Sequence, residues 1–230
     1  MGFLARRPDP LTKVRVVSPV RRALLNDLAR RIVTSSAGRV GVDGVDGSGK
    51  TVFAGELAGA LNNAGHEVVR VSIDGFHNPR SVRYRRGRSS PEGFWLDSYD
   101  YEQFRADVIA PLSPGGDRWY RSAVRDVTTD EAIETTPTRA PSDAILIVDG
   151  IFLHRDDLIG CWDFSIFLRV GFDETFRRMA ARDGRPADPH ADENSRYLLG
   201  QQIYLARCEP ENRADVVIDN TDPAEARRVN

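Results

Sequence analysis

The chain has 230 residues, of which 40% are hydrophobic and 29% charged, and its formal net charge is −2. This length fits one domain with a substantial core, and the near-neutral charge excludes a general attraction to nucleic acid or anionic membranes. Two cysteines, and no apolar run long enough for a membrane span or a signal peptide, predict a cytoplasmic protein without nucleic-acid or membrane partners.

The first part of the chain predicts a helix and two strands around a glycine-rich loop. Residues 1–17 are polar and contain prolines, so we expect an N-terminal arm followed by a single domain over 18–230. Ser18 and Pro19 are typical of a helix start. The apolar spacing then predicts a helix to about 34, a strand over 39–44, a helix over 50–65 and a strand over 66–74.

After the second predicted strand the chain is irregular, and the alternation of strands and helices returns only towards residue 144. Residues 77–98 are rich in arginine and show little periodicity, so no element is predicted there. A helix is expected from 99 to Pro111, because proline interrupts helices. Weak patterning indicates a β-hairpin made of 119–127 and 131–139. Further elements are expected as strands at 144–151, 164–170 and 214–220 and helices at 173–183 and 192–208.

Short apolar strands that alternate with helices predict an α/β fold, a parallel sheet with helices on both faces. In such sheets ligands bind at the carboxyl ends of the strands. Polar residues follow three of the predicted strands, at Gly44 and beyond, at Asp74 and at Asp149. We therefore expect the functional site at this edge of the sheet.

The stretch GVDGVDGSGKT, residues 41–51, matches the phosphate-loop pattern G-x-x-x-x-G-K-[ST] at every position. Backbone N–H groups and a helix N-terminus would hold the phosphates of ATP. Lys50, one of only two lysines, would reach the β- and γ-phosphates and is expected to be exposed in the empty enzyme. Thr51 would ligate Mg²⁺. The predicted nucleotide-binding residues are Gly44, Asp46, Gly47, Ser48, Gly49, Lys50 and Thr51.

A phosphate loop by itself does not identify a kinase. Guanine-nucleotide switches need an N/T-K-x-D motif, and neither lysine provides one downstream of the loop. Transport ATPases carry L-S-G-G-Q, and the nearest stretch, LLGQQ at 198–202, lacks the serine and the second glycine. A small-molecule kinase is therefore the predicted class.

Six segments resemble, in order and spacing, the uridine kinase and phosphoribulokinase-like P-loop kinases over about residues 38–220. They are GVDGVDGSGKT, VSIDGFH, PEGFWLDSYDYEQF, AILIVDGIF, RRMAARD and ADVVIDN. The resemblance implies a P-loop NTPase fold with an arginine-bearing lid and a small substrate-side hairpin. It also implies ATP and Mg²⁺ as cofactors and transfer of the γ-phosphate to a hydroxyl of a nucleoside-like or related polyol or alcohol.

The resemblance assigns roles to two carboxylates. Asp74 would orient and deprotonate the acceptor hydroxyl, with a turn residue before Gly75 as the alternative. Asp149 would hold Mg²⁺ or its waters, although the family more often has glutamate there, so the shorter side chain would act through water. Its alternative is a cap at the end of a strand.

Arginines and polar side chains complete the predicted site. The resemblance places Arg178 and Arg182 on one face of a lid helix as catalytic residues, and Arg185 beside them at the nucleotide. Surface charge is the alternative in so arginine-rich a chain. The predicted acceptor-binding residues are His77, Asp97, Tyr99, Tyr120 and Arg125.

The acceptor side departs from the family. Arg121 stands where uridine kinases have an aspartate, and Arg125 where they have a histidine. The acceptor is therefore expected to be anionic, or simply different from uridine. Two other functions stay open, namely a nucleoside-monophosphate kinase, for which DRW at 117–119 is a faint match, and a non-catalytic P-loop regulator. A homo-oligomer is left open as well.

Overall fold

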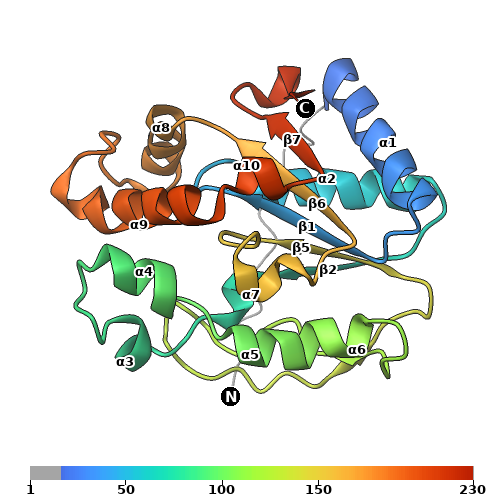
Figure 1. The fold of residues 1–230 in the computed structure, drawn as a ribbon, viewed down its shortest axis with the longest axis horizontal. Coiled ribbons are helices and arrows are strands. Elements are labelled where there is room, and N and C mark those ends of the chain that lie inside the picture. Colours follow the sequence, from blue (N-terminus) through green and yellow to red (C-terminus); the bar gives the residue numbers. More distant parts are fainter. Residues whose placement is uncertain (1–16, 230) are drawn as a thin grey trace, which may run out of the picture.

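A mostly parallel sheet forms the centre of the molecule (Figure 1). The computed structural model describes residues 17–229, so the predicted N-terminal arm lies outside the described residues apart from Val17. In the described part of the chain this sheet has six strands in the order β2-β5-β1-β6-β7-β8. Its strands are β1 (Arg39–Gly44), β2 (Val68–Ser72), β5 (Ile145–Asp149), β6 (Phe164–Arg169), β7 (Val216–Asp219) and β8 (Arg227–Arg228).

Helices cover both faces of this sheet, and each face has its own apolar core. α1 and α2 pack on one face, where Leu28 and Phe53 meet Val42. The other face is covered by α4, the α5–α6 region, α7 and α9, with Phe152 and Tyr204 fully buried there. The helices are α1 (Pro19–Thr34), α2 (Lys50–Asn63), α3 (Arg80–Arg83), α4 (Pro91–Asp97), α5 (Tyr101–Phe104), α6 (Ala110–Leu112), α7 (Asp156–Ile159), α8 (Phe172–Asp183), α9 (Asp192–Cys208) and α10 (Pro210–Arg213).

The predicted α/β class is confirmed, and the register explains why the polar strand ends meet. β5 pairs in parallel with both β1 and β2, so Asp149 lies opposite Val42 on one side and Ser72 on the other. The carboxyl ends of these strands therefore share one edge. The helix start at Ser18 is also as predicted, since its hydroxyl accepts a hydrogen bond from Arg21 N at 3.1 Å.

The helix predicted to end at Pro111 is present, and it ends one residue later, at Leu112. The helix runs through α5, a π-helical turn (Arg105–Ile109) and α6, and Pro111 lies within its last turn. A proline leaves the carbonyl four residues earlier without its helical donor. Here that carbonyl, of Asp107, accepts a hydrogen bond from Arg121 N at 3.1 Å, so the helix continues at no cost in unpaired groups.

Three further elements differ from the prediction. The hairpin is a ladder of two residues per strand, β3 (Trp119–Tyr120) against β4 (Thr138–Arg139). The second strand stops at Ser72, and a 3₁₀ turn (Ile73–Phe76) follows. α4 lies in the segment without a predicted element, because its apolar residues are consecutive rather than periodic. Its cap was detectable, since Ser90 accepts from Gly93 N at 3.0 Å. Among the described residues no helix is long and apolar enough to cross a membrane.

Candidate active site

The phosphate loop between β1 and α2 depends on two glycines with left-handed backbone. Gly47 has a φ of 78° and Gly49, the N-cap of α2, a φ of 92°. A Cβ at Gly47 would lie 2.5 Å from the Thr175 carbonyl oxygen of α8. Any side chain there would push α8 away. The loop can therefore wrap closely around the start of α2, where the first N–H groups have no helical partners.

Lys50 is folded back onto this loop, which corrects the prediction that it is exposed. Its Nζ donates a hydrogen bond to the Val45 carbonyl at 2.9 Å and lies 4.0 Å from Asp46 Oδ1. The side chain is only 11% exposed. The ammonium group is thus already held across the loop.

A cavity of about 420 Å³, here called the loop cavity, opens over these residues. It brings together residues from four separate segments of the chain, which the sequence had predicted as one site. Its lining includes Asp46, Gly47, Gly49, Lys50, Thr51, Asp74, Asp149, Arg178 and Arg182. Gly44 and Ser48, the other two predicted loop residues, do not line this cavity, and Ser48 is fully buried.

Thr51 and Asp149 form the predicted metal position. The Thr51 hydroxyl donates to Asp149 Oδ2 at 2.8 Å, and Asp149 is 2% exposed. Hydroxyl and carboxylate oxygens are the hard donors that Mg²⁺ prefers, so these residues fit that ion. No group of three or more His, Cys, Asp or Glu within the described chain could hold a metal by itself. Mg²⁺ would therefore share these two residues with nucleotide phosphates, as is usual for this ion.

Arg70 is an unpredicted member of this position. It donates to Asp149 Oδ1 at 3.0 Å and to the Thr51 carbonyl at 3.1 Å. Both carboxylate oxygens of Asp149 are therefore occupied, one by a hydroxyl and one by a cation. A charged residue within the apolar run VVRVS was the available signal in the sequence.

Asp74 lies on the 3₁₀ turn after β2, at the rim of the loop cavity. Its Oδ1 accepts a hydrogen bond from the Tyr99 hydroxyl at 2.8 Å. Burial, and then the charge of Asp74, raise the pKa of Tyr99 well above its usual range. Tyr99 therefore stays a neutral donor and fixes the orientation of the carboxylate.

His77 is held in one tautomer by the same turn. Its Nδ1 lies 2.7 Å from the Asp74 carbonyl oxygen. A carbonyl can only accept, so Nδ1 carries the proton. Burial lowers the pKa of His77, so the ring is neutral at pH 7 and Nε2 is free to accept a hydrogen bond. The ring also packs on Tyr99, with the centroids 4.5 Å apart.

Two further cavities continue from the loop cavity past His77. The middle cavity, of about 330 Å³, is lined in part by Asp74, His77, Tyr99, Arg182, Arg185 and Tyr197. The outer cavity, of about 530 Å³, is lined in part by His77, Asp100, Gln103, Arg121, Arg125 and Glu134. Asp74 thus borders the loop and middle cavities, and His77 borders the middle and outer ones.

The three arginines that were predicted to belong to a lid have different surroundings. Arg178 donates to Glu174 at 2.7 Å, to the Asn220 carbonyl at 3.0 Å and to the carbonyl oxygens of Gly47 and Ser48 at 3.3 and 3.4 Å. Arg182 pairs with Asp183 and borders both the loop and the middle cavity. Arg185 stacks over Tyr197 at 4.7 Å and lines the middle cavity.

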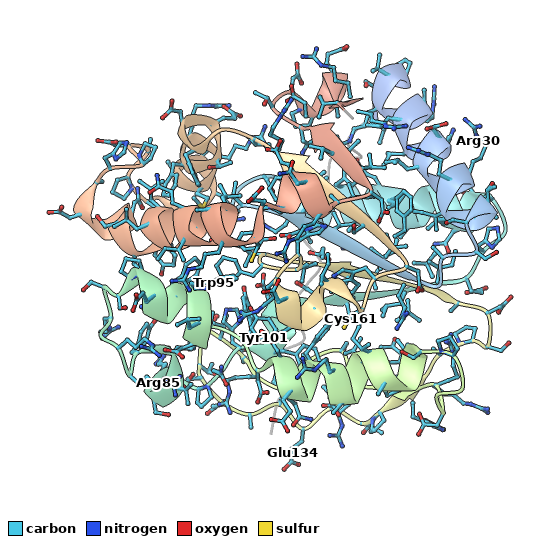
Figure 2. The ribbon with its side chains drawn as sticks, viewed as in Figure 1. Arg30, Arg85, Trp95, Tyr101, Glu134 and Cys161 are labelled. Carbon is cyan, nitrogen blue, oxygen red and sulfur yellow. The ribbon has the colours of Figure 1, made fainter. Side chains whose placement is uncertain are left out.

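Of the other predicted acceptor-binding residues, one faces a cavity and two are packed elsewhere. Arg125 lines the outer cavity and donates to the Asp130 carbonyl at 2.8 Å. Asp97 is buried, and its carboxylate pairs with Arg85 and Arg86; Figure 2 shows Arg85 near α3, at the rim of the molecule. Tyr120 is half-buried against the apolar core. Binding of the acceptor by Asp97 and Tyr120 stays a prediction.

Two buried amides that contact the loop were also missed. Asn220 Nδ2 donates to the Ser48 carbonyl at 2.7 Å, and its Oδ1 accepts from Arg21 at 2.8 Å. Gln201 Oε1 accepts from Asp46 N at 2.6 Å. No sequence motif marks either residue. Asn220 ends a predicted strand, and Gln201 lies on a predicted helix.

Solved structures of three kinases share this fold. A possible uridine kinase from Bacillus stearothermophilus is 24% identical, with a TM-score of 0.67 over 85% of this chain and 97% of that one. A candidate fructose transport system kinase from Silicibacter sp. is 24% identical, with a TM-score of 0.63 over 79% of this chain and 94% of that one. A D-glycerate 3-kinase from Cryptococcus neoformans is 13% identical, with a TM-score of 0.50 over 80% and 88%.

The similarity confirms the predicted resemblance at the level of the fold. The sheet and the helices on both its faces are arranged as in the structure of the possible uridine kinase. Comparison with protein-family models and with curated proteins finds no match.

Proposed function

We propose that this chain is an ATP-dependent kinase that transfers the γ-phosphate of ATP to a hydroxyl of a small molecule. The acceptor class we propose is a nucleoside-like compound or a related polyol or alcohol. One observation carries this proposal. Asp74 borders both the loop cavity and the middle cavity, with its carboxylate oriented by Tyr99. A base in this place can reach a hydroxyl that faces the phosphate chain.

Each residue of the site would have its own role in phosphoryl transfer. Loop N–H groups and Lys50 would bind the phosphates and keep the γ-phosphate in line with the acceptor. Asp74 would take the hydroxyl proton as the acceptor oxygen bonds to the γ-phosphorus, while the bond from that phosphorus to the β,γ-bridging oxygen breaks and ADP leaves. Arg182, which borders both cavities, would stabilise the charge on the transferred group, while Arg178 would hold the loop. When bound at Thr51 and Asp149, Mg²⁺ supplies further charge stabilisation on the phosphate oxygens.

A nucleoside-monophosphate kinase is the weaker alternative. Its DRW element at 117–119 should stand close to the phosphate loop. Arg118 instead donates to the carbonyl oxygens of Pro141 and Ala144, just before β5 begins. That is the amino end of the strand, whereas the cavities lie at the carboxyl end, so this arginine does not support binding of a second nucleotide.

The proposal is tested by a screen for phosphate transfer. Radiolabelled ATP is offered with nucleosides, pantothenate-like alcohols or sugar phosphates, and the labelled product is measured. We expect ATP consumption that rises only when the right acceptor is present. Nucleotide binding without turnover for any acceptor would instead favour a non-catalytic regulator.

The remaining acceptor contacts are part of the same proposal. His77 Nε2 would accept a hydrogen bond from an acceptor hydroxyl, and Arg125 would contact the far end of the molecule from the outer cavity. The proposal also includes a cytoplasmic location, no nucleic-acid or membrane partner, and either a monomer or a homo-oligomer.

A further inference from the structure

Gln201 contacts the phosphate loop from outside the cavities. It lies on α9 and is fully buried. Its Oε1 accepts a hydrogen bond from the backbone N–H of Asp46 at 2.6 Å, and its Nε2 donates to the Tyr197 carbonyl at 2.9 Å. Both ends of the amide are therefore engaged, and α9 fixes the direction of a loop N–H group.

Tyr204, three residues further along α9, holds the same loop at a second point. Residues three apart lie on one face of a helix. The buried Tyr204 hydroxyl donates to Asp43 Oδ2, and Asp43 Oδ1 accepts from Gly44 N at 2.6 Å. One face of α9 thus holds the loop at Gly44 and at Asp46.

The preceding turns of α9 contact the acceptor side. The guanidinium of Arg196 donates to the carbonyl oxygens of Gly87, Arg88 and Ser90 at 3.1–3.2 Å. Tyr197 lines the middle cavity. These contacts attach α9 to the α3–α4 segment, residues 80–98.

α4 and α9 lie side by side with little space between them (Figure 1). A Cβ at Gly200 would lie 2.7 Å from Phe94 Cδ1. Trp95 of α4 (Figure 2) packs on Tyr204, with ring centroids 5.4 Å apart. α4 ends at Asp97, two residues before Tyr99, which binds Asp74. We therefore expect a shift of α9 to move both the phosphate loop and the α3–α4 segment on the acceptor side.

We propose that α9 couples the acceptor side to the phosphate loop, with Gln201 as the positioning residue that carries the coupling. The inference rests on the proposed function for the identity of the two ligands. Closely packed helices slide as units rather than deform. A nucleotide that binds the phosphate loop, which Gln201 attaches to α9 through the Asp46 N–H, would therefore steady α9 and, through it, residues 80–98. Such coupling is reciprocal, so acceptor binding would in turn strengthen nucleotide binding.

The test compares two neighbouring glutamines, because Gln202 is exposed. Wild type, Gln201→Met and Gln202→Met are studied with the Mg²⁺ complex of the non-hydrolysable β,γ-imido analogue of ATP. Calorimetry gives its dissociation constant, and hydrogen–deuterium exchange follows residues 80–98. In wild type and Gln202→Met we expect the analogue to slow exchange there. In Gln201→Met we expect binding about tenfold weaker and no slowing at 80–98, even at a saturating concentration.

The outcomes separate this inference from the proposed function. If the analogue slows exchange at 80–98 in Gln201→Met as in wild type, the coupling role is overturned and the kinase proposal stands. If the analogue does not bind wild type at all, both are overturned. Should Gln201→Met fail to fold, the smaller Gln201→Ala removes the same contact with the Asp46 N–H, and undiminished slowing in that variant would overturn the inference.

Discussion

At the scale of residues, a substitution of Asp74 tests the chemical step most directly. Asp74→Asn keeps the size of the side chain and removes its charge, so a hydroxyl proton loses its acceptor. General-base assistance contributes about 10²- to 10⁴-fold, or about 3–5 kcal/mol of barrier. We expect kcat to fall by that factor while the affinity for MgATP, measured by calorimetry, changes little. A kcat within about threefold of wild type would mean that Asp74 is only a turn residue.

Arg70 and Asp149 determine how readily the site takes a divalent cation. Arg70 is about one-third exposed, so its pair with Asp149 should contribute up to about 1 kcal/mol. In Arg70→Gln the carboxylate is freed, and the Mg²⁺ concentration for half-maximal turnover should fall about two- to fivefold. Asp149→Asn should raise it. A higher Mg²⁺ requirement in Arg70→Gln would show that the arginine positions Asp149 rather than competing with the metal.

His77 should make folding stability depend on pH. Its lowered pKa means that the unfolded chain, with an imidazole pKa of about 6.5, binds a proton that the folded chain does not. Stability therefore falls as the pH drops below about 6.5, by at most about 1.4 kcal/mol per pH unit. Urea unfolding at pH 7.5 and 5.5 should show a larger loss for wild type than for His77→Asn. Equal losses would contradict the buried, neutral imidazole.

At the scale of elements, Gly200 and Gly59 are two helical glycines whose substitution by alanine tests how closely the helices pack. A Cβ at Gly200 of α9 would meet Phe94 Cδ1 at 2.7 Å and the Pro91 carbonyl oxygen at 2.9 Å, whereas nothing lies within 4 Å of one at Gly59 of α2. Gly200→Ala should lower the free energy of unfolding by about 1–3 kcal/mol, because α4 must move. Gly59→Ala should raise it by about 0.5–1 kcal/mol. Stabilisation by Gly200→Ala, measured by urea unfolding, would contradict the close packing of α4 on α9.

The elements differ in how far they could be predicted from the sequence, for physical reasons. β1, α2 and the loop between them were predictable, because apolar runs, periodicity and the glycine spacing all agree. α4 was missed because tertiary contacts with α9, rather than its own pattern, stabilise it. The Asp107 carbonyl, which Pro111 leaves without a helical donor, is paired by the distant Arg121 N–H. Arg70, Gln201 and Asn220 belong to the site only through such long-range contacts, which a single sequence does not display.

At the scale of the whole molecule, the site is held from both sides of the sheet. Arg21 of α1 binds Asn220, which binds the Ser48 carbonyl, while Gln201 of α9 binds Asp46 on the other side. The phosphate loop is thus held by both helical layers, and the loop cavity lies at the carboxyl ends of β1, β2 and β5. These contacts would hold the short loop in one conformation for the phosphate chain of the proposed nucleotide.

The central claim, phosphoryl transfer at this loop, is tested most directly with the two lysines of the chain. Transfer from labelled ATP to the acceptor found by the screen is measured for wild type, Lys50→Ala and Lys13→Ala, with melting temperatures as a check on folding. We expect Lys50→Ala to lose transfer to background, because the cation across the loop is gone, while Lys13→Ala keeps wild-type turnover. Wild-type turnover in a normally folded Lys50→Ala would contradict the account.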